Sequence, residues 1–235
     1  RAEAELAVGL PLLWEMAQEG LRDGLHGILR ADAGGNDSWS PLEFEAAFGP
    51  DAGIPVEIRC GAQGAGTAPL AVSLRGKIDR IDVGPGGAFR VIDYKTGKLP
   101  GKAFKDGGSL QLPVYLLAGK AFLHAHGRAA DLEASEAAYW SLREGAMGFE
   151  GKGWEGTLEK LRRVTSTVAS GIEAGIFHPV PGPNRKNCDH CTFYEVCDPR
   201  VEAIASRKDD ERLRPLEDLK GSLDAAEDPA VEMDP

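Results

Sequence analysis

The chain has 235 residues, of which 42% are hydrophobic and 27% are charged, and its formal net charge is −10 at pH 7. This composition is typical of a globular protein of one large domain, and it excludes both a small disulfide-stapled scaffold and a low-complexity chain. No window approaches the roughly 20 consecutive apolar residues that a membrane helix requires, so no membrane partner is expected.

The start of the chain lacks both an initiator Met and the basic-then-apolar pattern of a signal peptide. We therefore expect a cytoplasmic protein whose chain is a fragment or a processed piece. Its negative charge argues against a nucleic-acid partner. However, half of the excess lies between Ser206 and Pro235, which hold ten acidic and five basic residues. A metal would neutralise further carboxylates, so charge neither supports nor excludes DNA.

The predicted elements begin with an amphipathic helix that starts at Pro11 and ends before Asp32. Strands are expected at 42–48, 56–60, 70–83, 89–94 and 137–142, and further helices at 109–126 and 157–174. The segments 70–83 and 89–94 flank a four-residue Gly/Pro turn and predict a β-hairpin. The predicted fold class is α/β, with a central mixed sheet that carries this hairpin and helices on its faces.

The hairpin brings three charged residues together. Because side chains alternate across a strand, Asp93 and Lys95 share one face. On the partner strand Asp79 shares a face with Ile81, while Asp82 points the opposite way. A surface ion pair on a half-solvated sheet is the alternative. We favour a metal site because Asp93 lies in an apolar run, and aspartate is rarely buried without a partner.

Two neighbouring carboxylates repel each other unless a proton or a cation lies between them. Mg²⁺ prefers oxygen ligands and retains water molecules for chemistry. A lysine beside such a site can steer or deprotonate one of these waters, and it can offset the charge that builds on a phosphate. The three residue types therefore indicate metal-assisted hydrolysis.

Asp79, then Asp93-Tyr94-Lys95, then the segment from Gln111 to Tyr115 together resemble the RecB-like, AddB-type branch of the PD-(D/E)XK nuclease superfamily. The resemblance covers residues 41–199 and implies a restriction-endonuclease-like core. It implies that Asp79, Asp93 and the Tyr94 carbonyl hold the metal and that Lys95 is the catalytic lysine. Gln111 and Tyr115 would reach the site or the DNA backbone from one helical face; an ordinary amphipathic helix is the alternative.

Two further residues follow from the resemblance. The segment 41–49 is similar to the strand that carries an additional acid, for which we choose Glu45, although Glu43 shares its face. The family also carries a metal-binding histidine upstream of the hairpin. His26 is the only upstream histidine in the chain, and the alternative is a histidine that precedes Arg1.

Three cysteines, Cys188, Cys191 and Cys197, lie within ten residues. Closely spaced thiolates suit an iron–sulfur cluster or zinc. The resemblance implies a [4Fe–4S] cluster whose fourth cysteine lies outside this chain, because Cys60 is expected to be a buried core cysteine. Zinc with His190 or His178 as the fourth ligand is the alternative, and three unliganded thiols are another.

The resulting interpretation is a nuclease domain over 1–205, followed by a charged, partly disordered tail over 206–235. Mg²⁺ or Mn²⁺ would activate water to cleave DNA, by resemblance as an exonuclease on single-stranded ends that a helicase partner delivers. Lys98, Lys102 and Lys105 would neutralise phosphates, or they are solvated loop charges. A non-catalytic DNA-binding or scaffolding subunit that retains the fold is the rival function.

Overall fold

The computed structural model describes residues 10–34, 38–60, 70–97, 110–143, 146–151, 154–177 and, with short gaps, 179–218. The helices are α2 (Pro11–Gly34), α3 (Gln111–Ala125), α4 (Glu155–Glu173) and α5 (Val201–Ala205). The strands are β1 (Ser40–Phe48), β2 (Val56–Arg59), β3 (Ala71–Leu74), β4 (Gly76–Val83), β5 (Ala88–Lys95), β6 (Asp131–Ser141) and β7 (Ala146–Gly151). Among the described helices, none combines the length and the apolar character that crossing a bilayer requires.

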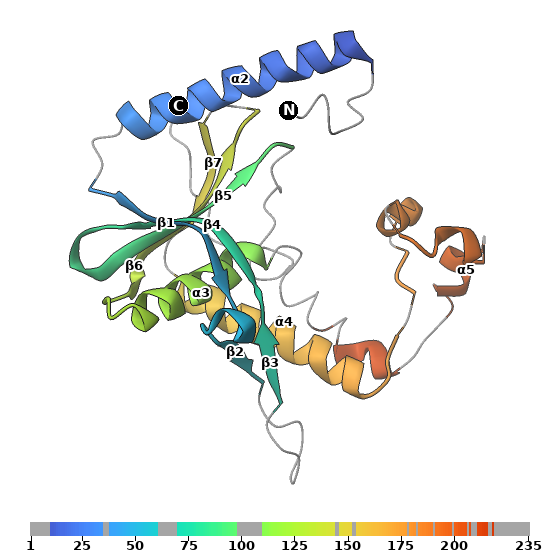
Figure 1. Ribbon diagram of the computed structural model, residues 1–235. Helices are drawn as coiled ribbons and strands as arrows, with labels where there is room; N and C mark the ends of the chain where they lie inside the picture. Colours follow the sequence, from blue (N-terminus) through green and yellow to red (C-terminus); the bar gives the residue numbers. More distant parts are fainter. Residues whose placement is uncertain are drawn as a thin grey trace, which may run out of the picture. The chain divides into compact units, whose positions relative to one another are not determined.

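Five strands form the main sheet in the order β1-β4-β5-β6-β7, while β2 and β3 form a separate pair. Neighbouring strands are antiparallel except β5 and β6, which are parallel. Parallel neighbours require a crossover connection, and α3 supplies it. The chain is therefore mixed α/β, with the predicted hairpin formed by β4 and β5 at the centre of the sheet (Figure 1).

Helix α3 covers one face of the sheet and builds the larger apolar core (Figure 1). Leu116 and Leu123 of α3 are fully buried in the same cluster as Ile81 and Val91 of the hairpin. Gly119 permits this close approach, because a Cβ at that position would lie 2.9 Å from the Phe89 ring. The packing places the first turn of α3 over the end of β5.

Helix α2 covers the opposite face of the sheet. Ile28 packs there against Ile92 and Trp140. Gly24 lies against the main chain after β6, since a Cβ there would meet the Leu142 carbonyl oxygen at 1.7 Å. With a helix on each face, β5 is buried from Ala88 to Asp93, so any charge on it requires a partner.

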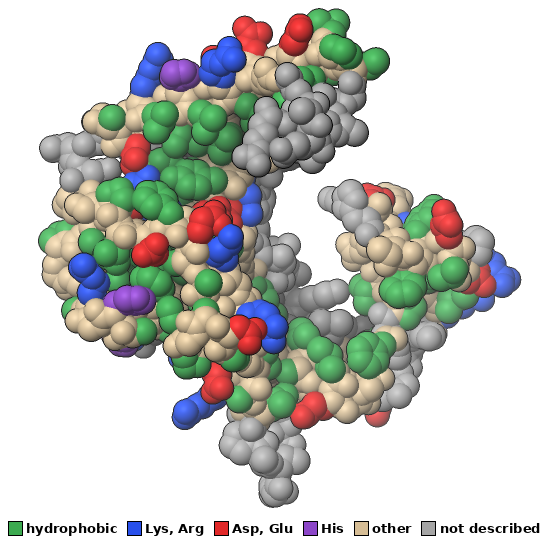
Figure 2. Space-filling model, in the orientation of Figure 1, with side chains coloured by type: hydrophobic (Ala, Val, Ile, Leu, Met, Phe, Trp, Pro, Cys, Tyr) green, Lys and Arg blue, Asp and Glu red, His purple; other side chains and the backbone are tan. Residues whose placement is uncertain are grey.

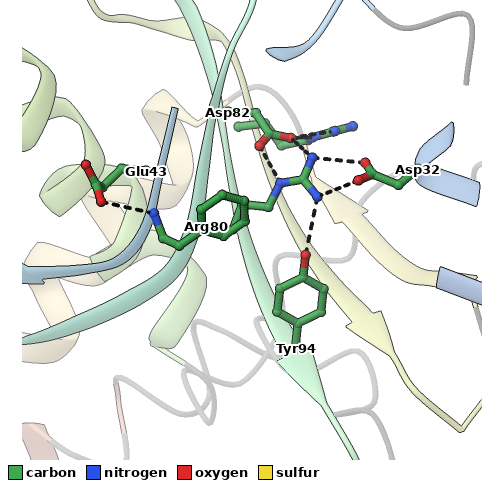
Figure 3. A network of polar contacts seen from close by, with 7 residues as sticks. Asp32, Glu43, Arg80, Asp82 and Tyr94 are labelled. Atoms are coloured by element: carbon green, nitrogen blue, oxygen red, sulfur yellow. Dashed lines mark hydrogen bonds and ion pairs between the residues drawn. The ribbon is translucent and has the colours of Figure 1, made fainter. Parts of the chain in front are cut away.

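Buried charges between α2 and the sheet are paired (Figure 3). Asp82, which is fully buried, accepts hydrogen bonds from both Arg80 and Arg90. Asp32 of α2 accepts two hydrogen bonds from Arg80, each 2.9 Å long. Burial by itself lowers the pKa of the Arg80 guanidinium, but the hydrogen bonds to Asp32 and Asp82 outweigh it, so the pKa is raised and the charge is retained.

Large apolar side chains are exposed along α2 and immediately before it, and Figure 2 shows hydrophobic side chains at the N-terminal end of the helix. Their exposed fractions range from 39% to 69%: Leu10, Leu12, Leu13, Met16, Leu21, Leu25 and Leu29. Only Gly24 and Ile28 of the helix are buried. The sheet therefore covers only the side of α2 that carries Gly24 and Ile28.

The described chain separates into two compact units, with a boundary between Arg162 and Arg163 inside α4. The first unit holds the sheet with α2 and α3. The second contains residues 59–70 and 163–235, with α5 and short 3₁₀ turns around the cysteines. Within it, the buried Val201 and an Asn184 N–H donated to the Glu202 carboxylate hold the turns near α5.

Several predicted boundaries differ from the structure. Helix α2 continues past Asp32 to Gly34, because Asp32 is paired with Arg80. The expected strand over 70–83 is interrupted at Arg75 into β3 and β4, which belong to different sheets. Strand β7 was not expected. Much of the predicted tail lies outside the described residues.

Replacement of Asp82 by Asn should destabilise the fold strongly, because it removes the buried negative charge that Arg80 and Arg90 share. We expect a loss of about 3–5 kcal/mol in the free energy of unfolding, as for other broken buried ion pairs, measured by urea denaturation. Asp51→Asn, which alters the exposed pair with Arg75, is the matched control and should leave stability nearly unchanged. Equal midpoints for the two variants would contradict the assigned role of the network.

Candidate functional site

The residues that the sequence singled out on the hairpin lie where β5 ends beneath the first turn of α3. Asp93 is 3% exposed, in agreement with its place in an apolar run. Gln111 begins α3 and donates from Nε2 to Oδ1 of Asp93 over 2.7 Å. Nζ of Lys95 lies 2.7 Å from Oδ2 of Asp93. The structure thus brings Asp93, Lys95 and Gln111 into direct contact.

Desolvation dominates the electrostatics of Asp93. Burial raises the pKa of the Asp93 carboxyl; Lys95 opposes this, and the charge of Asp79 adds to it. Burial lowers the pKa of Lys95, but the hydrogen bond and charge of Asp93 outweigh it, so its pKa is raised. The lysine is therefore a cation at neutral pH, and a further positive charge would stabilise the ionised form of Asp93.

Gln111 connects the site through both ends of its amide, which offers two donors and an acceptor. Its Oε1 accepts from Nζ of Lys95 at 2.9 Å, and its Nε2 also donates to the Tyr115 oxygen at 3.1 Å. Gln111 and Tyr115 therefore lie on one helical face and in contact, as their four-residue spacing predicts. The amide oxygen of Gln111 faces the Lys95 ammonium, which donates, and the amide nitrogen faces the Asp93 and Tyr115 oxygens, which accept. This orientation of the amide is therefore consistent with all three contacts.

Tyr115 contributes a neutral phenol. Burial raises its pKa first, and the charges of Asp93 and Asp79 raise it further. Its ring meets Phe48 edge-on with centroids 6.3 Å apart. The phenol is therefore held in one orientation and stays protonated at neutral pH, so that it can act as a hydrogen-bond donor.

Asp79 lies where β4 and β5 separate. The last paired residues are Arg80 and Ile92, and beyond them Oδ2 of Asp79 accepts a hydrogen bond of 2.9 Å from the Tyr94 backbone N–H. Ile78 and Ile81 both pack into the core beneath α3 although they are three residues apart. Side-chain alternation therefore slips by one residue around Asp79, an irregularity that the sequence pattern did not predict.

The structure places Glu45 beside this irregularity, in β1. Its flanking residues pair with Arg80 and Ile78 of β4, so Glu45 lies across from Asp79. Its φ of 55° is in the left-handed region, which is costly for a residue with a side chain and is concentrated at functional sites. The Glu45 carboxylate is exposed and forms an ion pair with Lys77.

His26 lies on the exposed side of α2, beside a shallow groove that includes Trp14 and Arg22. Because α2 covers the face of the sheet opposite α3, the structure does not bring His26 together with Asp93 and Gln111. Helix periodicity alone could not show which face of the sheet the helix would cover.

Tyr139 is a site residue that the sequence did not reveal. It is paired with Asp93 in the parallel β5–β6 ladder. Nζ of Lys95 lies 5.3 Å from the centroid of its ring, and its hydroxyl lies 3.5 Å from Oε1 of Gln111. An aromatic residue in a strand is ordinary, and only the parallel register places this one against the lysine.

The donor set fits a divalent cation. The Oδ2 atom of Asp93 is buried and lies 2.7 Å from Nζ of Lys95, and a carboxylate oxygen with one such contact retains a lone pair for a cation. Asp79 supplies a second carboxylate nearby. Within the described ranges no three His, Cys, Asp or Glu side chains gather as a metal site. The remaining ligands would therefore be main-chain oxygens, such as the Tyr94 carbonyl, and water.

The three clustered cysteines lie in consecutive tight turns. The Cys191 N–H donates to the Cys188 carbonyl, and the Cys197 N–H donates to the Phe193 carbonyl, both at 3.1 Å. None of the three forms a disulfide, and Cys60 is buried as expected. The histidines considered as alternative ligands and the lysines expected to meet phosphates lie outside the described residues: His178, His190, Lys98, Lys102 and Lys105.

Comparisons with known proteins agree with this geometry. A family model for the PD-(D/E)XK nuclease superfamily matches residues 4–198. A 94-residue segment is 35% identical to one of the subunits of an ATP-dependent helicase/deoxyribonuclease from Pelotomaculum thermopropionicum. The match covers 38% of this chain and 8% of that protein, so the chain spans only a small part of its relative.

Replacement of Gln111 by Leu should raise the pKa of Asp93 further. The change removes the donor to Oδ1, and a carboxylate that loses a hydrogen bond to its charged form holds its proton to higher pH. The pKa can be measured in metal-free protein by NMR titration of the aspartate carboxyl carbons. Gln18→Leu on α2 is the control. An Asp93 titration that is identical in the wild type and Gln111→Leu would contradict the proposed contact.

Proposed function

Because the chain belongs to the PD-(D/E)XK nuclease superfamily, we propose that it is a deoxyribonuclease that uses Mg²⁺ or Mn²⁺. The observation that carries the proposal is the buried Asp93 carboxylate, which lies against Lys95 and Gln111 and retains lone pairs for a cation. We assign residues 1–205 to the nuclease domain, with 206–235 as a tail. We expect the protein to act in the cytoplasm.

Asp79, Asp93 and the Tyr94 carbonyl would hold the cation. When bound, it would supply Lewis-acid activation of water and neutralise charge on the phosphate. Lys95 is cationic and held by Asp93 and Gln111, so it can offset the charge that develops on a non-bridging oxygen in the transition state.

The other polar residues would orient Asp93, Lys95 and the substrate. Gln111 bridges Asp93 and Lys95 and keeps the two groups at fixed separation. The neutral Tyr115 phenol can donate to a phosphate oxygen. Glu45 is proposed as the additional acid, and its left-handed backbone, across from Asp79, supports this role. His26 remains a weaker proposal, because it lies on a helix over the other face.

Single-stranded DNA ends are the proposed substrate, with a helicase as partner. The similarity to part of a helicase/deoxyribonuclease supports both. The rival function is a DNA-binding or scaffolding subunit that retains the fold without catalysis. We favour the enzyme because Asp93, Lys95 and Gln111 are in direct contact in this chain.

Cleavage assays distinguish the two functions. With labelled single-stranded DNA and Mn²⁺, Asp93→Ala and Lys95→Ala should each lower the rate by at least about 100-fold, since they remove charge stabilisation specific to the transition state. Lys120→Ala on α3 is the control for loss of a lysine. In the same assay Glu45→Gln should reduce the rate more than Glu43→Gln. Wild-type DNA binding without metal-dependent cleavage would support the scaffolding function.

We also propose that Cys188, Cys191 and Cys197 bind a [4Fe–4S] cluster, with a fourth cysteine from outside this chain and zinc as the alternative. Their close spacing in adjacent turns, with no disulfide between them, supports binding to one shared cluster. Anaerobically purified protein should contain iron and sulfide and absorb near 400 nm, and Cys191→Ser should lose both. Cys60→Ala is the control. Zinc in place of iron would select the alternative.

A further inference from the structure

Two contacts bridge the hairpin where its ladder ends, and they come from adjacent residues of β4. Asp79 accepts a hydrogen bond from the Tyr94 backbone N–H, whereas Nη1 of Arg80 donates to the Tyr94 hydroxyl at 3.3 Å. The same β5 residue is therefore held by its main chain on the α3 side and by its side chain on the α2 side. Beyond the last pair of Arg80 and Ile92, these contacts replace the missing ladder.

The orientation of Arg80 is set from α2. Asp32 accepts one hydrogen bond from each terminal nitrogen of the guanidinium, and Asp82 accepts from Nε and from Nη2 (Figure 3). Bidentate contacts of this kind fix the plane of the guanidinium as well as its position. The Arg80 side chain is 4% exposed and lies 5.4 Å from the Trp140 ring. The group that donates to Tyr94 is thus held on three sides.

Each member of the carboxylate pair immediately precedes one of these residues: Asp79 precedes Arg80, and Asp93 precedes Tyr94. A shift of the Arg80 or Tyr94 backbone therefore moves a carboxylate. Constellations that bind metals tolerate about 0.5 Å of displacement. We propose that Arg80 and Asp32 are positioning residues that set the separation of Asp79 and Asp93 from the opposite face of the sheet. Docking of α2 then becomes a condition of metal binding.

This inference rests on the proposed function, namely that Asp79 and Asp93 hold a divalent cation. It differs from a purely structural role of the buried ion pairs in what it predicts. A structural role requires only that loss of Asp32 lowers stability. A positioning role also requires weaker metal binding in protein that is still folded, because the two carboxylates no longer stand at the same separation.

The test is a calorimetric titration of Mn²⁺ into the full chain, stripped of divalent metal and without DNA. Asp32→Asn keeps the shape of the side chain and removes its charge, and we expect about 10-fold weaker binding, as for other residues that support metal ligands. Tyr94→Phe removes only the hydroxyl and retains the ring against Trp140, and it should weaken binding in the same direction but by less than Asp32→Asn does. Asp23→Asn, on the exposed side of α2, should bind as the wild type does.

Asp93→Ala separates failure of this inference from failure of the proposed function. Binding that persists in Asp93→Ala belongs to other sites and is subtracted. If the wild type shows no binding beyond this, the proposed function falls, and the inference falls with it. If Asp32→Asn melts at a lower temperature but binds Mn²⁺ as tightly as the wild type, the ion pair is only a structural anchor and the inference is overturned. Should Asp32→Asn not fold, unchanged affinity in Tyr94→Phe overturns it equally.

Discussion

Desolvation of the Asp93 carboxylate is the physical constraint on which the site depends. Helices on both faces of β5 remove Asp93 from water, and a carboxylate in that environment is costly unless positive charge or donors surround it. Lys95 and Gln111 supply part of this compensation, yet the pKa of Asp93 remains raised. The remaining electrostatic cost supports the proposal that the site accepts one more cation.

Charge is arranged differently on the two faces of the hairpin. On the α2 face, Arg80 and Arg90 are matched by Asp82 and Asp32 through several hydrogen bonds. On the α3 face Lys95 and Gln111 compensate the buried Asp93 carboxylate only in part, since its pKa remains raised. A fully satisfied network is rigid, while an incompletely satisfied one leaves a group free to bind. The hairpin thus carries a rigid ion-pair network on its α2 face and the candidate site on its α3 face.

Much of the fold and most of the central site could be predicted from the sequence. The Gly/Pro turn between two apolar runs predicts the hairpin, and strict alternation places Asp93 and Lys95 on one face, because both signals are local. The four-residue spacing of Gln111 and Tyr115 likewise predicts a shared helical face. The slip at Asp79 and the left-handed Glu45 escaped prediction, since both arise from how β1 and β4 adapt to each other rather than from either segment alone.

The sequence by itself therefore determined which candidate site residues share a face, because strand and helix periods orient neighbouring side chains without reference to the rest of the chain. Only the tertiary structure decided which distant groups meet them. Tyr139 reaches Lys95 through a parallel register that α3 imposes, and Asp32 reaches Arg80 because Gly24 lets α2 pack closely. The same packing of α2 leaves His26 on the exposed side of the helix, away from Asp93. Such contacts depend on the packing of whole elements, which no local pattern encodes.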